Sequence, residues 1–143
     1  MDFVPGSINQ LSQIISQVVA PAFLLGAVAS FVSILASRMN GVIERMRYIN
    51  DLPPEGHAKS RLKEDLPRLR RRVDLLQRSL LYAIASGVAG ALLIVVAFGA
   101  AMLHRDHVWG TALLFTVSMV MLCISLGLLA AEVRIGLNEF DQQ

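Results

Sequence analysis

Three long apolar runs, separated by charged segments, dominate the hydropathy pattern of this 143-residue chain. The runs extend from Phe3 to Ser37, from Ser79 to Leu103 and from Val108 to Ala131, and none contains Asp, Glu, Lys or Arg. Each can cross a hydrocarbon core of about 30 Å, which requires roughly 20 helical residues. Helices are expected because lipid offers no hydrogen-bond partners to backbone N–H and C=O groups. The pattern therefore predicts an all-α integral membrane protein with three transmembrane helices.

The expected elements form a single membrane domain over residues 1–143. It begins with an outer amphipathic turn and the first transmembrane helix, with Ser7 as the N-cap of a capping box. The third helix is expected to end at Gly136. In chain order the segments are 7–37 for the turn and first transmembrane helix, 38–78 for a cytoplasmic basic helical hairpin, 79–103 for the second transmembrane helix, 108–131 for the third, and 132–143 for a cytoplasmic tail.

The hairpin is predicted from a change in apolar spacing after the first run. Apolar residues recur at alternating steps of four and three residues in two series. The first series is Leu35, Met39, Val42, Met46 and Ile49, and the second is Leu62, Leu66, Leu69, Val73, Leu76 and Leu80. This is the a/d spacing of coiled coils, and the turn-forming segment 50–56 lies between the two series. We expect an antiparallel, coiled-coil-like hairpin in which Val42 faces Leu69 and Leu35 faces Leu76. Pro67 should kink or break its second arm.

The basic residues predict the orientation of the chain. The net charge is only +2, yet eleven of the thirteen Lys and Arg residues lie in 38–78. Short basic loops remain in the cytoplasm, so we expect a membrane protein with its N-terminus outside and its C-terminus inside. Arg71, Arg72 and Arg78 should contact anionic lipid headgroups, which attract each by about 1 kcal/mol. No aromatic residues are interleaved with this basic run for stacking on bases, so no nucleic-acid partner is expected.

One acidic residue is expected to complete a basic collar at the cytoplasmic membrane surface. In the predicted register Arg38 faces Arg72, which is unfavourable for two like charges. Glu132, at the cytoplasmic end of the third run, can accept charge-assisted hydrogen bonds from both guanidinium groups. We therefore expect Glu132 to lie between them.

The first transmembrane helix carries uncharged polar and small residues that allow two interpretations. They are Gln13, Gln17, Pro21, Gly26, Ser30, Ser33 and Ser37. Small residues at these spacings favour close packing of another helix, whereas a set of polar groups can also line a narrow pore. On a straight helix the Gln and Ser groups point in nearly opposite directions, so the pore interpretation requires a kink at Pro21.

Few residues could carry catalysis or bind a cofactor. His104, Asp106 and His107 provide fewer ligands than a closed metal site requires, and Cys123 has no base or cation near it in sequence. No nucleophile lies near an acid–base partner, and no charge lies at mid-membrane, where a proton relay would place one. We expect no enzymatic activity, no cofactor and no bound metal.

Residues 13–25 (QIISQVVAPAFLL) and 38–47 (RMNGVIERMR) resemble an uncharacterised bacterial family of small three-span membrane proteins, classed as a domain of unknown function. The resemblance covers nearly the whole chain and includes residues 132–135 (EVRI) near its end. It implies a bacterial inner-membrane location. It supplies no activity, ligand or catalytic residue.

Two functions are consistent with this sequence. The first is a non-enzymatic, homo-oligomeric scaffold or regulatory protein that presents its basic hairpin to a cytoplasmic protein partner. All three spans carry small residues, which favour close packing between helices. A single three-helix monomer has few helix–helix interfaces in which these residues can pack. The alternative is a homo-oligomeric ion channel or pore lined by the first transmembrane helix.

Overall fold

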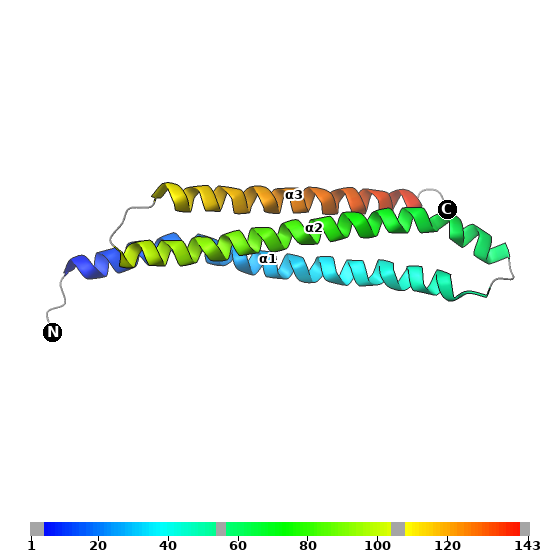
Figure 1. Ribbon diagram of the computed structural model, residues 1–143, viewed down its shortest axis with the longest axis horizontal. Helices are drawn as coiled ribbons and strands as arrows, with labels where there is room; N and C mark the ends of the chain where they lie inside the picture. The colour runs from blue at the N-terminus through cyan, green and yellow to red at the C-terminus, as the bar shows by residue number, and fades with distance from the viewer. Residues whose placement is uncertain (1–4, 54–56, 104–107, 141–143) are drawn as a thin grey trace.

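The computed structural model describes residues 5–53, 57–103 and 108–140. Helix α1 spans Pro5–Asp51, α2 spans His57–Met102 and α3 spans Val108–Phe140, and these described ranges contain no β-strand. The helices lie side by side along one long axis, with α2 in contact with both of the others (Figure 1). Each helix contains an 18-residue window with a mean hydropathy of 2.3 or 2.4. Three apolar helices of this length indicate a multi-pass membrane protein.

The first two helices continue without interruption from the apolar runs into the basic segment. α1 passes through Ser37 and Arg38 to Asp51, and α2 begins at His57 and continues into the second apolar run. Pro67 lies inside α2 and does not break it. One missing N–H donor removes a single backbone bond, and a helix absorbs this as a bend. The beginning of α2 is indeed inclined to the rest of the helix in Figure 1.

Two predicted helix ends are wrong. α1 begins at Pro5 and not at Ser7. Proline suits a first turn because its missing N–H would have no intrahelical partner there. α3 continues through Gly136 to Phe140, because a glycine inside a helix costs only about 1 kcal/mol relative to alanine and does not by itself end it.

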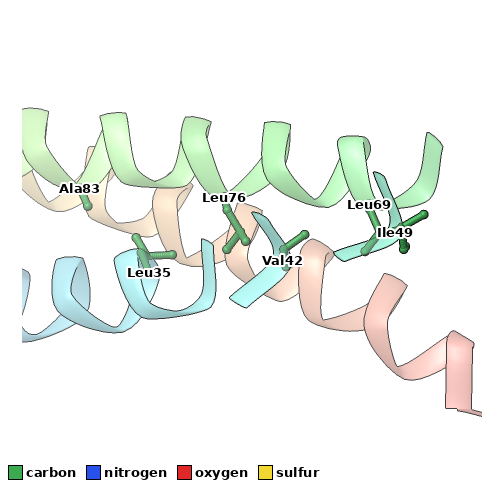
Figure 2. Packing of buried hydrophobic residues seen from close by; sticks show 6 residues of the cluster. All are labelled: Leu35, Val42, Ile49, Leu69, Leu76 and Ala83. Carbon is green, nitrogen blue, oxygen red and sulfur yellow. The ribbon is translucent and has the colours of Figure 1, made fainter. Parts of the chain in front are cut away.

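A cluster of buried apolar residues joins α1 to α2, and its members recur every seven residues along each helix. It consists of Leu35, Val42, Ile49, Leu69, Leu76 and Ala83, and Figure 2 shows the two sets facing each other. The expected partners Val42 and Leu69 both belong to it, as do Leu35 and Leu76. Beyond the apolar runs, burying such a side chain away from water contributes about 1.5–3 kcal/mol. Inside lipid the same contacts act through close packing alone.

Two glycines of α2, just beyond Ala83 of this cluster, let α1 approach closely. A Cβ added to Gly87 would lie 3.2 Å from Cγ1 of Val28, and one added to Gly90 would lie 3.5 Å from Cδ2 of Leu25. The later glycine on α2, Gly90, contacts the earlier residue on α1, Leu25, whereas Gly87 contacts Val28. α1 and α2 therefore run in opposite directions, as Figure 1 also shows.

Reciprocal serine hydrogen bonds fasten α2 to α3. The hydroxyl of Ser79 donates to the carbonyl of Ser125 at 2.7 Å, and the hydroxyl of Ser125 donates to the carbonyl of Ser79 at 2.6 Å. Ser86 and Ser118 exchange the same two bonds at 2.8 Å each. All four side chains are fully buried. Interhelical hydrogen bonds in membranes contribute about 0.6 kcal/mol each on average, and the small serine side chains bring the two backbones close together.

We predict that Val42 and Leu69 cross-link when both are replaced by cysteine in a Cys123→Ala background. Both side chains are buried in the same cluster, and a disulfide requires Cβ atoms about 3.5–4.5 Å apart. Mass spectrometry after mild oxidation and proteolysis would identify the linked peptides. The proposed contact would be contradicted if Val42→Cys reacted with Arg78→Cys and failed to react with Leu69→Cys.

Candidate functional site

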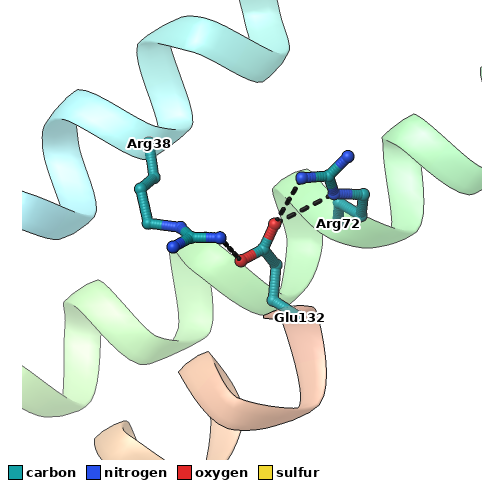
Figure 3. A network of polar contacts seen from close by, with 3 residues as sticks. All are labelled: Arg38, Arg72 and Glu132. Carbon is teal, nitrogen blue, oxygen red and sulfur yellow. Dashed lines mark hydrogen bonds and ion pairs between the residues drawn. The ribbon is translucent and has the colours of Figure 1, made fainter. Parts of the chain in front are cut away.

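Three charged residues from three different helices meet at one carboxylate. Glu132 of α3 is 0% exposed, whereas the side chains of Arg38 on α1 and Arg72 on α2 are 39% and 15% exposed. Nε of Arg72 donates to Oε1 of Glu132 at 2.9 Å, and its Nη2 lies 2.9 Å from the same oxygen. Nη2 of Arg38 lies 3.0 Å from the other oxygen, Oε2. Figure 3 shows the carboxylate between the two guanidinium groups, and these three residues are named the charged triad.

The spacing that aligns the serines also aligns Arg72 with Glu132. Arg72 precedes Ser79 by seven residues on α2, and Glu132 follows Ser125 by seven on α3. Seven residues return a side chain to nearly the same helix face, so the ion pair is the next layer of the α2–α3 contact. Arg38 joins from α1, which otherwise touches α3 very little. The charged triad is therefore where all three helices are tied together.

Gly136 provides space for the guanidinium group of Arg72. A Cβ added to Gly136 would lie 3.3 Å from Nη2 and 3.5 Å from Cζ of Arg72. These distances leave no room for a methyl group unless the arginine moves. The glycine therefore serves as a gap in the surface of α3, one turn beyond Glu132, and not as the end of the helix.

The two carboxylate oxygens of Glu132 are held in different ways. Oε1 accepts a hydrogen bond from Nε of Arg72 and lies 2.9 Å from its Nη2, whereas Oε2 lies 3.0 Å from Nη2 of Arg38 and has no hydrogen bond of good geometry. Arg38 thus acts on Oε2 through its charge more than through a directed bond. An unpaired charge in such a place costs several kcal/mol, and the two arginines together compensate the buried carboxylate.

The other two basic residues of the expected collar lie apart from the charged triad. Arg71 and Arg78 are exposed on α2. Nε of Arg78 lies 3.2 Å from Oδ2 of Asp74, one turn earlier, with both side chains more than half exposed. An exposed pair of this kind contributes at most about 1 kcal/mol. The predicted contact of Arg71 and Arg78 with lipid headgroups stays a prediction.

Most of the polar and small residues predicted on the first helix face away from the rest of the chain. Pro21 is buried, and the exposed members of the set are Gln13, Gln17, Gly26, Ser30, Ser33 and Ser37. The hydroxyl of Ser30 donates to the carbonyl of Gly26 in its own helix at 3.1 Å. These six residues of α1 are therefore not buried by packing within the chain.

Sequence reasoning missed the serine pairs. For the second and third spans the sequence indicated only that they carry small residues. The signal was their common spacing, because Ser79 and Ser86 on α2 and Ser118 and Ser125 on α3 are each seven residues apart. The ion pairs of Glu132 with Arg38 and Arg72, in contrast, are the contacts expected from the sequence.

The described residues contain no group of three or more His, Cys, Asp or Glu side chains that could hold a metal ion. The loop residues considered for such a site, His104, Asp106 and His107, lie outside the described residues. Cys123 is exposed on α3 and forms no disulfide.

Comparison with protein families gives a match over residues 18–141 to a family described as "Protein of unknown function (DUF2721)". The chain belongs to this family. The matched DUF2721 region contains all three residues of the charged triad and begins after Gln13 and Gln17. Comparisons with curated proteins and with solved structures gave no match. The function of this family is unknown, so the match adds no activity to the geometry.

We predict that Glu132→Gln lowers the thermal stability of the purified protein, because the neutral amide leaves two cations close together without their counter-charge. Losing one partner of a buried ion pair costs on the order of 3 kcal/mol. Adding Arg72→Gln should recover part of this loss, since it removes one unpaired cation. A double-mutant cycle based on unfolding measurements would test the coupling. Strict additivity of the two substitutions would show that Glu132 and Arg72 do not interact.

We also predict that Gly136→Ala destabilises the protein by displacing the guanidinium group of Arg72 from Glu132. Gly127→Ala is the matched control, because a Cβ added to Gly127 has nothing within 4 Å. The control should be neutral or stabilising, since alanine favours a helix over glycine by about 1 kcal/mol. Thermal unfolding of the two variants in the same detergent provides the comparison. Equal behaviour of the two variants would contradict the steric role of Gly136.

Proposed function

We propose that the protein is a non-enzymatic, homo-oligomeric scaffold or regulator of the bacterial inner membrane that presents a basic helical hairpin to the cytoplasm. The observation that carries this proposal is the unused face of α1. A stripe of small residues there is exposed and lies opposite the buried residues Val28 and Leu35 that face α2. Its members are Ala22, Gly26, Ser30, Ser33 and Ser37.

The stripe is suited to contact between two copies of the chain. Lipid offers no hydrophobic gain for helix association, so helices associate where small residues permit close approach. A Cβ added to Gly26 has nothing within 4 Å, so this part of α1 is open to another helix. Helix α1 of a second copy would pack closely against this stripe, which neither α2 nor α3 of the same chain covers.

The lengths of α1 and α2 support a hairpin that projects from the membrane. α1 has 47 residues and α2 has 46. At about 1.5 Å per residue each is roughly 70 Å long, more than twice the thickness of the hydrocarbon core. The fourteen residues from Arg38 to Asp51 account for about 21 Å of this length. The concentration of Lys and Arg in this part favours a cytoplasmic position.

The projecting hairpin offers two kinds of contact. Its exposed arginines, including Arg71 and Arg78, are placed to meet anionic lipid headgroups where the helices leave the membrane. Its paired arms, held together by a seven-residue apolar repeat of the coiled-coil type, present a rigid surface to a cytoplasmic protein partner.

A homo-oligomeric pore lined by α1 is the second candidate. It is favoured by the exposed, uncharged polar side chains of Gln13, Gln17 and Ser33 on α1, because polar groups can select ions without buried charge. Recordings from planar bilayers would separate the two functions. Conductance that changes with Ser33→Leu would favour the pore, and silence in every salt tested would favour the scaffold.

We predict that the wild-type protein is an oligomer in native mass spectrometry and cross-linking, and that Gly26→Leu weakens this association. The leucine fits the single chain without a clash but prevents close approach of a second α1. Gly127→Leu is the matched change on α3, where a Cβ also has nothing within 4 Å. A monomeric wild-type protein would overturn the proposal. Dissociation by Gly127→Leu and not by Gly26→Leu would move the interface to α3.

A further inference from the structure

An open-sided hollow of about 270 Å³ lies beside the charged triad. α1 contributes Arg38, Gly41 and Arg45 to its walls, α2 contributes Arg72, and α3 contributes Glu132. Apolar side chains of the α1–α2 core also line it. A water molecule occupies about 30 Å³ of the liquid, so the hollow has room for a polyatomic anion together with water.

The α1 wall of the hollow has a cation at each end and a gap in the middle. Arg38 and Arg45 are seven residues apart, which places them on one helix face about 10 Å apart along the axis. Gly41 lies between them, and a Cβ added there would have nothing within 4 Å. The absence of a side chain at Gly41 therefore keeps the space between the two arginines open.

The charges around the hollow do not balance. Three guanidinium groups face one carboxylate, and both oxygens of that carboxylate are already matched with Arg38 and Arg72. Arg45 is exposed, and within the described part of the chain no carboxylate forms an ion pair with it. Arg38 contributes Nη2 to Glu132 while its side chain remains 39% exposed. The hollow thus has an excess of two positive charges and guanidinium groups that a ligand can reach.

Phosphate is the anion whose chemistry fits this arrangement. Its several oxygens accept hydrogen bonds from more than one arginine, and the guanidinium fork matches phosphate geometry. The hollow also begins at Arg38, the first charged residue after the apolar run that ends at Ser37. This is the depth at which a membrane presents lipid phosphates, and basic pockets between helices on the cytoplasmic side bind lipid headgroups.

We propose that this hollow is a binding site for a phosphate group, supplied by an anionic lipid headgroup or by free phosphate. Arg45 and Arg38 hold the phosphate oxygens, and Arg72 adds its charge from beneath while it remains bound to Glu132. Gly41 is the residue that leaves space for the ligand. The site is formed within one chain, so it does not depend on the oligomeric state proposed above.

Two substitutions test the site without touching the charged triad, and each has a matched control. Arg45→Gln removes a cation from the wall, and Arg47→Gln removes an exposed cation of the same helix that lies outside the hollow. Gly41→Leu fills the hollow, and Asn40→Leu adds the same side chain at the neighbouring exposed position. All four full-length variants should unfold close to the wild-type temperature when no ligand is present.

Ligand binding is measured as a saturable rise in unfolding temperature of the full chain in a neutral detergent. One arm adds inorganic phosphate at constant ionic strength, with chloride as the reference, because screening alone changes with salt. The other arm adds phosphatidylglycerol to the micelles, with phosphatidylcholine as the reference. A hydrogen bond to a charged group is worth about 1.5–3 kcal/mol, which corresponds to a loss of roughly ten- to hundredfold in affinity for Arg45→Gln.

Saturable stabilisation that is lost in Arg45→Gln and Gly41→Leu but retained in Arg47→Gln and Asn40→Leu supports the site. A response to inorganic phosphate identifies free phosphate as a sufficient ligand. A response to phosphatidylglycerol alone identifies the lipid headgroup as the source. The proposal is overturned if neither ligand saturates, or if Arg47→Gln weakens binding as much as Arg45→Gln does. The second result would show attraction by overall charge and no defined site.

Discussion

The arrangement of the three helices depends on one buried carboxylate. α1 and α3 both lie against α2 and barely touch each other, so neither contact alone determines the angle between them. Glu132 supplies the missing constraint because Arg72 and Arg38 approach its two oxygens from different helices. Burying a charge is tolerable only with partners of this quality. The identities of all three residues are consequently linked, and their ion pairs place α1 relative to α3 together with Leu129 of α3, which packs against the α1–α2 cluster.

α2 carries two different contact surfaces with one common period. Toward α1 it presents Leu69, Leu76 and Ala83, and toward α3 it presents Ser79 and Ser86. The first surface works in water and in lipid, since leucine packing is favourable in both. The second suits lipid, where hydroxyl groups need partners and small side chains permit close approach. The same geometry leaves the space between α1 and α3 open beyond the charged triad, and there the hollow forms.

The parts of this structure that follow from local pattern could be predicted from the sequence. Hydropathy predicted three membrane-length helices, and the a/d spacing placed Val42 and Leu69 in one core. The charged triad could be anticipated because register and depth brought two like charges together near a carboxylate. The role of Gly136 could not be predicted. In a sequence, a glycine that ends a helix cannot be told from a glycine that makes room for an arginine of another helix. The serine pairs and the hollow depend on which helix faces which, and periodicity on a single helix does not contain that information.

The repeated serine contact has an ambiguity that only the ion pair resolves. Ser79 with Ser125 and Ser86 with Ser118 are chemically identical pairs, so α3 could slide by seven residues, about 10 Å, and still match one serine with another. Sliding in one direction would place Glu132 opposite Ser79, and sliding in the other would place it opposite Asp65. Each displaced alignment strands a buried negative charge away from Arg72. The two serine pairs hold α2 and α3 together but are interchangeable. The Arg72–Glu132 ion pair differs from them, and it makes only one alignment of the two helices favourable as the chain assembles in the membrane.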